Sequence, residues 1–410
     1  MLTNSKNPET SFCFTNNKPS IPSKITAKTP LESLNLNWSE KDLPEKIRTK
    51  HVHKLHPYLG KFIPQLVEIF LRKYFKAGQT VLDPFCGSGT TLVQANELGI
   101  NSIGYDVSAF NVLLCKAKTD VYNLRQAHIE IMDILGKVNT ATASGGKQQS
   151  LLGETKHNEL PVLKTDNEYL KQWFAPQSLK ELLTYRYYLE RENYQYKNLL
   201  KIILSRSARS ARLTTHFDLD FPKKPQTGPY WCYKHSKVCR PTRSAFKFIK
   251  RYSMDTLRRI EEFSKIRTNA WVKVCHGDCR KVNFPPVDGV ITSPPYVGLI
   301  DYHEQHAYGY HLLDLEDNRE KEIGPAAKGS SRKAQQKYQK DIANVFKRTI
   351  LSLPRGGRII VVAGDRNNLY VEIAEQIGVE IEAVVQRHVN RRTGRRSSKF
   401  YESVFVWKKP

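Results

Sequence analysis

Apolar residues recur at helical spacing in the segment from Phe62 to Phe75. The apolar positions in this segment are Phe62, Ile63, Leu66, Val67, Ile69, Phe70 and Tyr74. This spacing brings them to one face of a helix, and Pro64 is tolerated in a first helical turn. The pattern predicts an amphipathic helix.

A different pattern follows this helix. Thr80–Asp83 is a short apolar run typical of a buried strand, and residues 84–89 form the turn Pro-Phe-Cys-Gly-Ser-Gly. A helix is predicted from Thr90 to Leu98, and a second strand from Asn101 to Tyr105 leads to Asp106. Strand, glycine turn, helix, strand and terminal acid are the parts of one βαβ unit.

The alternation breaks off after a helix predicted at Ala109–Ala117. Residues 137–150, rich in Thr, Ala, Ser and Gly, are a linker by composition. Residues 167–209 have helical spacing that predicts two helices, whereas residues 214–242 are irregular. Strands are predicted again at residues 271–276, 289–292, 358–363, 382–388 and 401–407, the last two as an antiparallel pair across the basic turn 390–399.

This order of elements predicts an α/β protein with a doubly wound, Rossmann-like sheet and a helical and irregular insertion. We expect residues 1–50 to form a flexible N-terminal arm, because they are polar and irregular. Residues 51–120 then form the first part of the α/β domain, residues 121–268 the insertion, and residues 269–410 the second part of the domain.

Basic residues outnumber acidic ones, with 65 Lys and Arg against 40 Asp and Glu and a formal charge of +25 over 410 residues. An excess of this size favours a polyanionic partner such as nucleic acid. We expect no membrane partner, because the sequence has no apolar run of bilayer length and no evident basic amphipathic helix. The polar segment Met1–Asn17 lacks the layout of a secretory signal, so we expect the protein to act in the cytoplasm.

The seven cysteines are an odd number and lie far apart, which argues against a disulfide framework. Cys232 and Cys239 bracket His235, and Cys275 and Cys279 lie close together. Neither pair has the two-residue gap of a zinc knuckle, so we expect reduced thiols and no metal site.

The glycine turn and Asp106 together predict a cofactor site. Glycines at the end of a first strand allow close backbone approach, and an acid about twenty residues later binds ribose hydroxyls. The turn alone fits a dinucleotide, S-adenosylmethionine or no ligand. The dinucleotide is disfavoured because Leu92 stands where a third glycine would be, and a phosphate-binding Gly-Lys-Ser/Thr is absent after the turn.

A second candidate site is the segment Thr-Ser-Pro-Pro-Tyr at residues 292–296, directly after an apolar strand. Successive prolines fix the backbone and remove two N–H donors, which leaves a turn made of acceptors. Such a turn suits an amino group whose hydrogens are accepted by the Ser293 hydroxyl and the Pro294 carbonyl, while Tyr296 stacks on a base outside the duplex. The alternative is a rigid strand-exit turn with a packing tyrosine.

Asp-Pro-Phe-Cys-Gly-Ser-Gly, Gly-Tyr-Asp, Thr-Ser-Pro-Pro-Tyr and the basic middle of the chain together resemble the amino-group DNA methyltransferases, especially the cytosine-N4 enzymes of restriction-modification systems. The resemblance covers Leu55–Lys118 and the chain from Trp271 onward. It implies a class I methyltransferase fold, S-adenosylmethionine as cofactor and double-stranded DNA as partner. It also implies base flipping and direct in-line methyl transfer.

By this resemblance the catalytic residues are Ser293, Pro294, Pro295 and Tyr296. The implied cofactor residues are Lys61, Phe62, Asp83, Pro84, Phe85, Gly87, Gly89, Thr90, Asp106 and Asp278. In the family, the stretch that matches residues 56–64 closes over the cofactor, and the match to Gly277-Asp278 contacts the adenine ring; an ordinary loop and a surface turn are the alternatives. The chain departs from the family's common order, because its insertion falls between the ribose-binding acid and the third strand.

Serine before Pro-Pro-Tyr is the family's tendency for cytosine N4, so cytosine is favoured over adenine N6. Methylation of an RNA base is a further possibility, and so is DNA binding without catalysis. The resemblance also implies a prokaryotic or phage setting and a restriction endonuclease for the same site. The oligomeric state stays open, since a monomer is able to methylate the two strands in turn.

Candidate DNA contacts are cations for phosphates and aromatic rings for bases. In the insertion these are Arg206, Arg209, Arg212, Lys223, Lys224, Trp231, Tyr233, Arg240 and Arg243. The basic turn adds Arg391, Arg392, Arg395 and Arg396. A solvated basic surface is the alternative for each group.

Overall fold

The structure is a computed structural model that describes residues 18–60, 62–143, 164–214, 224–232, 235–389 and 400–410. Helices up to residue 211 are η1 (Pro22–Lys24), η2 (Leu31–Ser33), α1 (Glu45–Arg48), η3 (His51–Lys54), α2 (Pro64–Tyr74), α3 (Thr90–Glu97), α4 (Ala109–Thr119), α5 (Leu124–Thr142), α6 (Glu168–Trp173), α7 (Pro176–Arg191) and α8 (Lys197–Ala211). Later helices are α9 (Phe246–Ser264), α10 (Tyr302–Gln305), α11 (Ala307–Leu313), η4 (Arg319–Lys321), η5 (Ala326–Lys328), α12 (Arg332–Leu351) and α13 (Leu369–Ile377).

The main sheet has the strand order β5-β2-β1-β6-β7-β9-β8. Its strands are β1 (Thr80–Asp83), β2 (Asn101–Asp106), β5 (Val272–His276), β6 (Gly289–Thr292), β7 (Arg358–Ala363), β8 (Glu380–Val389) and β9 (Phe400–Lys408). The five strands β5, β2, β1, β6 and β7 run parallel to one another. Strand β9 lies between β7 and β8 and is antiparallel to both, which confirms the predicted antiparallel pair of the last two strands. The predicted doubly wound α/β fold is confirmed, and the strand order reverses direction between β1 and β6.

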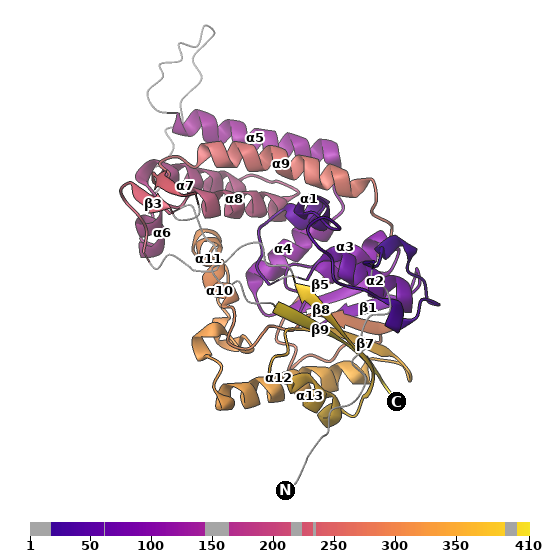
Figure 1. Ribbon diagram of the computed structural model, residues 1–410. Helices are drawn as coiled ribbons and strands as arrows, with labels where there is room; N and C mark the ends of the chain where they lie inside the picture. Colours follow the sequence, from indigo (N-terminus) through magenta and orange to yellow (C-terminus); the bar gives the residue numbers. More distant parts are fainter. Residues whose placement is uncertain (1–17, 61, 144–163, 215–223, 233–234, 390–399) are drawn as a thin grey trace.

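Both faces of this sheet are covered, as parallel strands require (Figure 1). Ile359 and Val361 of β7 pack in the cluster that contains α12 and α13. Ile360 and Val362, which point the other way, pack in the cluster that contains α2. Alternate side chains of one strand therefore enter two separate apolar cores, because successive residues of a strand face opposite sides.

The segment before α2 corrects the expectation of a flexible arm. Leu34 and Leu36 are fully buried and belong to the same apolar cluster as Phe70 of α2. The indole nitrogen of Trp38 donates a hydrogen bond to the Ser20 carbonyl at 3.0 Å. The prediction was wrong for residues 18–50, because a few spaced apolar side chains suffice to dock a polar segment onto a helix; residues 1–17 lie outside the described part.

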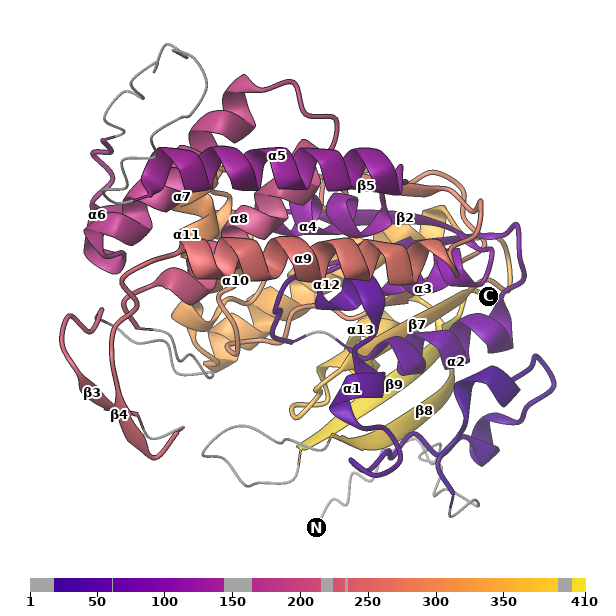
Figure 2. The ribbon, with the colours of Figure 1, turned by 90° about the horizontal axis from the view of Figure 1, so that it is seen from above.

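Helices α5 to α9 pack together with α4 and α11 around an apolar cluster of their own. Helices α5 and α9 lie across the top of the molecule in Figure 1, and Figure 2 shows them side by side from above. Residues 167–209 form three helices rather than the predicted two, because Pro176 begins α7 after the short α6. Residues 230–239, predicted as irregular, contain a small antiparallel ribbon of β3 (Tyr230–Cys232) and β4 (Lys237–Cys239).

Two buried carboxylates hold the helices of this bundle to one another. Glu181 of α7 accepts hydrogen bonds from the backbone N–H groups of Ala245 and Phe246 at the start of α9. Glu130 of α5 accepts from the backbone N–H of Tyr196 before α8 at 2.9 Å. The N-termini of helices carry unpaired N–H groups and partial positive charge, so an acid there stabilises the packing. Within the described residues, no helix is both long and apolar enough to cross a bilayer.

Candidate active site

A pocket opens at the carboxyl ends of β1, β2, β5 and β6, where the strand order reverses. In open α/β sheets this is the usual place for a ligand. The lining residues are Tyr58, Gly60, Phe62, Pro84, Phe85, Cys86, Gly87, Ser88, Thr90, Asp106, Val107, Ser108, Asn111, Gly277, Asp278, Cys279, Ser293, Pro295, Tyr302, Lys321, Glu322 and Ile323. The segments after the four strands therefore meet in one cavity.

The glycine turn after β1 depends on backbone angles that other residues avoid. Gly87 has a φ of +49° and Gly89 a φ of +77°. A Cβ on Gly89 would lie 2.9 Å from the sulfur of Cys115, and one on Gly87 would lie 3.2 Å from the hydroxyl of Tyr58. The turn thus needs glycine for its conformation and for the space around it.

Asp106 ends β2 and holds the glycine turn in place. Its Oδ2 accepts a hydrogen bond from the Gly87 N–H at 2.9 Å. Its Oδ1 accepts from the Ser108 N–H at 2.8 Å and from the Asn111 side-chain amide at 3.1 Å. Burial raises the pKa of this carboxyl group, and these hydrogen bonds oppose the shift. The result is a fixed acceptor on the pocket wall.

A hydrogen bond joins the glycine turn to the Ser-Pro-Pro-Tyr turn. The Thr292 hydroxyl donates to Oδ1 of Asp83 at 2.6 Å, and the Phe85 N–H donates to the same oxygen. Asp83 is fully buried, and this burial raises its pKa to about 6. The Pro295 carbonyl accepts from the Tyr338 hydroxyl at 2.8 Å, which fixes the second turn from its other side.

Comparison with known proteins identifies the family. A family model described as DNA methylase, for N6 and N4 enzymes, matches residues 4–116. Type II methyltransferase M.MjaII of Methanocaldococcus jannaschii is 39% identical over 433 residues, which cover 89% of this chain and 82% of that protein. The chain belongs to the N6/N4 DNA methylase family. It is a type II DNA methyltransferase, and S-adenosylmethionine is its methyl donor.

More distant similarities were also found. Type II methyltransferase M.BsoBI of Geobacillus stearothermophilus is 25% identical over 68% of this chain and 56% of that protein. Among solved structures, TrmN from Thermus thermophilus aligns with 12% identity and a TM-score of 0.31 over 86% of this chain and 50% of that chain.

The pocket of this DNA methyltransferase fits the chemical groups of the donor. S-adenosylmethionine carries a sulfonium cation, ribose hydroxyls and amino groups, and the pocket wall has the carboxyl groups of Asp106, Asp278 and Glu322. Phe62 and Phe85 add apolar surface. The pocket therefore combines acceptors for the polar groups with rings that exclude water.

Most of the predicted cofactor residues line this pocket. Those on its wall are Phe62, Pro84, Phe85, Gly87, Thr90, Asp106 and Asp278. Asp83 and Gly89 do not line it: Asp83 is buried beneath the turn, and Gly89 caps the start of α3. Lys61 lies outside the described residues.

Asp278 forms an ion pair with Arg280, whose Nη2 lies 2.8 Å from Oδ2 of the acid. Partial burial raises the pKa of Asp278, but the hydrogen bonds and positive charge of Arg280 outweigh this effect and hold the pKa below its usual value. Arg280 also contacts Asp341 of α12 at 3.1 Å. The turn after β5 is thus held to α12 through Arg280.

The Ser-Pro-Pro-Tyr turn contributes Ser293 and Pro295 to the pocket wall, but neither Pro294 nor Tyr296. The Tyr296 ring packs against the apolar cluster beneath the sheet, and its hydroxyl donates to Glu402 at 3.0 Å. Glu402 also pairs with Arg387 across β8 and β9 at 2.7 Å. An anchored hydroxyl thus holds this ring against the core.

Three pocket residues, Tyr58, Tyr302 and Glu322, were not among the predicted site residues. Tyr58 stacks on Tyr302, with ring centroids 5.6 Å apart and planes at 20°. Glu322 bonds to the buried imidazole of His303. Tyr302 and Glu322 reach the pocket because the chain after β6 returns to it through α10 and η4. Only Tyr58 lies in a stretch that the family resemblance had marked.

The predicted DNA contacts fall into different environments. Arg212 is only 2% exposed and stacks on the Tyr308 ring at 4.6 Å, so the prediction that it contacts phosphate was wrong. Arg206 pairs with Asp255 at 2.7 Å, and Arg209 is half-buried. The exposed candidates are Lys224, Trp231, Arg240 and Arg243. Lys223, Tyr233, Arg391, Arg392, Arg395 and Arg396 lie outside the described residues.

Proposed function

We propose that this type II DNA methyltransferase transfers a methyl group from S-adenosylmethionine to the exocyclic N4 of cytosine in duplex DNA. The observation that carries the proposal is the shared pocket. Ser293 of the Ser-Pro-Pro-Tyr turn lines the same cavity as Gly87 and Asp106 of the cofactor turn. A base amino group bound at Ser293 would therefore lie next to the methyl donor, as direct transfer requires.

The turn at residues 293–295 is suited to activate an amino group. An aryl amine is a poor nucleophile because its lone pair is delocalised into the ring. The Ser293 hydroxyl oxygen and the Pro294 carbonyl accept the two N–H hydrogens, which draws the nitrogen toward tetrahedral geometry and directs its lone pair at the donor. No covalent intermediate with the protein is needed, and the methylated ammonium is acidic enough to lose its proton to water.

We propose the following cofactor contacts. Asp106 accepts hydrogen bonds from the ribose hydroxyls, Gly87 and Phe85 adjoin the methionine part, and Asp278 and Phe62 adjoin the adenine end. The fixed carboxylate of Asp106 and the positive φ of Gly87 support these roles. When bound, S-adenosylmethionine supplies an electrophilic methyl group.

Cytosine is proposed over adenine because Ser293 replaces the aspartate that often precedes Pro-Pro-Tyr in adenine enzymes. The anchored Tyr296 adds a requirement. To stack on a base that has left the duplex, its ring must present a face on the pocket side while its hydroxyl stays bound to Glu402.

We further propose that residues 51–120 and 269–410 form the methyltransferase domain and that residues 121–268 recognise DNA. The exposed cations and the exposed Trp231 of the insertion support this division. A restriction endonuclease for the same site, and action in a prokaryotic cytoplasm, belong to the same proposal, because the relatives are named type II methyltransferases of prokaryotes.

The test is to incubate the purified protein with plasmid DNA and isotope-labelled S-adenosylmethionine, digest the DNA and identify the labelled nucleoside by mass spectrometry. We expect N4-methylcytosine. Labelled N6-methyladenine would refute the cytosine assignment and retain the mechanism of the turn. Label in RNA alone would refute the DNA assignment, and no label in either would favour a DNA-binding protein without catalysis.

A further inference from the structure

The β3–β4 hairpin is unusual because little apolar packing holds it. Its strands pair over only Tyr230–Cys239, Trp231–Val238 and Cys232–Lys237. Trp231 is 53% exposed and Val238 is 59% exposed. Figure 2 shows the hairpin at the edge of the molecule, away from the main sheet. A two-stranded ribbon of this length is marginally stable in water unless something else fixes it.

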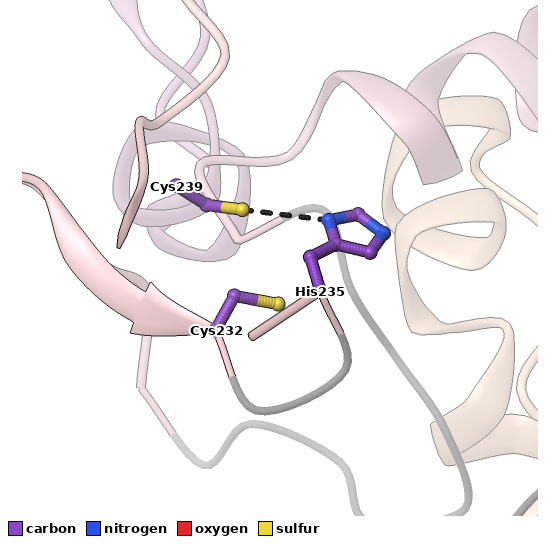
Figure 3. A group of neighbouring side chains, drawn as sticks. All are labelled: Cys232, His235 and Cys239. Carbon is purple, nitrogen blue, oxygen red and sulfur yellow. Dashed lines mark hydrogen bonds between the residues drawn. The ribbon is translucent and has the colours of Figure 1, made fainter. Parts of the chain in front are cut away.

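Three side chains that can bind a metal lie close together on this hairpin. Cys232 ends β3, Cys239 ends β4, and His235 lies in the turn between them. Their ligand atoms all lie within 4.8 Å of one another. Figure 3 shows the two sulfurs and the imidazole pointing toward a common space.

One distance in this group matches that between two ligands of a tetrahedral zinc ion. The sulfur of Cys239 lies 3.5 Å from Nδ1 of His235. Zinc–sulfur bonds of about 2.3 Å and zinc–nitrogen bonds of about 2.0–2.1 Å at the tetrahedral angle place the two ligand atoms roughly 3.5 Å apart. Cys239 and His235 thus already have the spacing of two ligands of one zinc ion.

We propose that Cys232, His235 and Cys239 bind one structural Zn²⁺ ion, with water as the fourth ligand. Two thiolates and an imidazole are a soft donor set that favours zinc over magnesium or calcium, and binding releases the thiol protons to solvent. Both cysteines are reduced in the structure, as ligation of zinc requires. The ion joins the two strands and the turn.

This inference reverses the expectation drawn from the spacing of the cysteines. No metal site was expected, because neither cysteine pair has the two-residue gap of a zinc knuckle. The hairpin instead pairs Cys232 with Lys237 and Tyr230 with Cys239, so Cys232 and Cys239 lie on one face of the ribbon as diagonal neighbours. Pairing across the strands, rather than the gap along the chain, brings the ligands together.

A second group, His51, His53 and Glu97, also has its ligand atoms within 4.8 Å of one another. It differs because the Lys50 ammonium lies 2.5 Å from the Glu97 carboxylate and neutralises it. His53 bonds to the Gln94 side chain at 3.2 Å. These contacts explain the grouping without a metal, whereas the hairpin group brings together two thiols, the ligand type that favours zinc.

The role proposed for the ion is to fix the hairpin that carries Trp231 and lies next to Arg240. This role rests on the proposed DNA contacts, but the metal site itself does not. Metal content is measured without DNA or methyl transfer, so failure of the proposed function and failure of the metal site are distinguishable.

The experiment uses the full chain without a polyhistidine tag, saturated with Zn²⁺, dialysed and analysed for metal by mass spectrometry. We expect about one zinc per chain, from the tight binding of thiolate sites. C232S and C239S are expected to retain less than about a tenth of that amount, because each removes a thiolate ligand. C275S is the matched control, since Cys275 is a half-buried cysteine of β5 that lies outside the group.

H235C keeps a ligand at position 235 and should restore zinc that H235A loses. Binding of S-adenosylmethionine by each variant, measured by calorimetry, checks that the main domain is folded. Wild-type protein without zinc, or C232S and C239S with as much zinc as the wild type, would overturn the proposal. Faster tryptic cleavage after Lys237 upon chelation is expected if the ion fixes the hairpin, and an unchanged rate would refute that role.

Discussion

The pocket at the sheet edge and the helical bundle of α5–α9 use charged side chains in opposite ways. At the pocket, Asp106 is bound by backbone N–H groups that come from its own turn and from the glycine turn. In the bundle, Arg212 is a predicted DNA contact that instead serves packing, as does the buried Glu181. Arg212 stacks on aromatic rings, and Glu181 caps the start of α9.

The difference arises from what each region must build. The pocket is formed by strand ends, whose positions follow from the sheet, so a short motif after each strand suffices to place its residues. The bundle is formed by helix faces, where one arginine can pack, form an ion pair or meet solvent depending on the rotation of its helix. Sequence motifs therefore predict which residues come together well at the sheet edge and poorly in the bundle.

The largest effect is expected for S293A, which tests the functional side of this comparison. Removal of the hydroxyl that accepts from the amino group should lower kcat by about 100- to 1000-fold, the range seen for loss of one catalytic hydrogen-bond group. Binding of S-adenosylmethionine should stay unchanged. Single-turnover methylation and calorimetry measure the two quantities, and undiminished methylation would disprove the role of the hydroxyl.

R212A tests the packing side. Loss of a buried, stacked side chain should lower the free energy of unfolding by about 2–4 kcal/mol. The salt dependence of DNA binding should not change, because this guanidinium is out of reach of phosphate. Urea denaturation and binding titrations measure both effects, and a stable variant with weakened DNA binding would return Arg212 to the set of DNA contacts.

A pH effect is expected at Asp83, beneath the pocket. Its folded pKa of about 6 lies above the unfolded value, so the folded state binds the proton more tightly and stability falls as the pH rises from about 4 to 6. This loss amounts to at most about 3 kcal/mol, and D83N should lack it because asparagine does not titrate. Chemical denaturation across this range measures the difference between the two proteins, and parallel profiles would contradict the shift.

D106A should weaken S-adenosylmethionine binding by about 10- to 100-fold, because hydrogen bonds to a charged group are worth about 1.5–3 kcal/mol. The exposed Asp120 at the end of α4 gives a matched control, and D120A should bind normally. Calorimetry without DNA measures the affinity of each variant for S-adenosylmethionine. Equal affinities of D106A and D120A would show that Asp106 does not bind the cofactor.

The smallest effect is expected for the exposed cations beside the hairpin. R240A/R243A should weaken DNA binding several-fold and reduce the salt slope by about two, one for each phosphate contact. Thermal stability should remain that of the wild type, in contrast to R212A. A salt titration of DNA affinity measures the slope, and an unchanged slope would assign both arginines to a solvated surface.

Much of the α/β domain could be predicted from the sequence. The strands β1, β2, β5, β6, β7, β8 and β9, the antiparallel pairing of the last two, and the glycine turn all follow from local patterns. Ser293, Gly87 and Asp106 lie in one pocket because each lies at or just after the carboxyl end of a parallel strand, and these ends share one edge of the sheet.

The sequence by itself determined the elements whose signal is local: hydrophobic period, glycine at positive φ, and proline in a turn. Tertiary structure alone decided that Tyr302 and Glu322 complete the pocket, that Leu34 and Leu36 dock onto α2, and that Tyr296 is anchored by Glu402. The physical reason is the range of the interactions. Backbone preferences act between neighbours in the chain, whereas burial and charge pairing depend on which distant segment arrives to contact a given side chain.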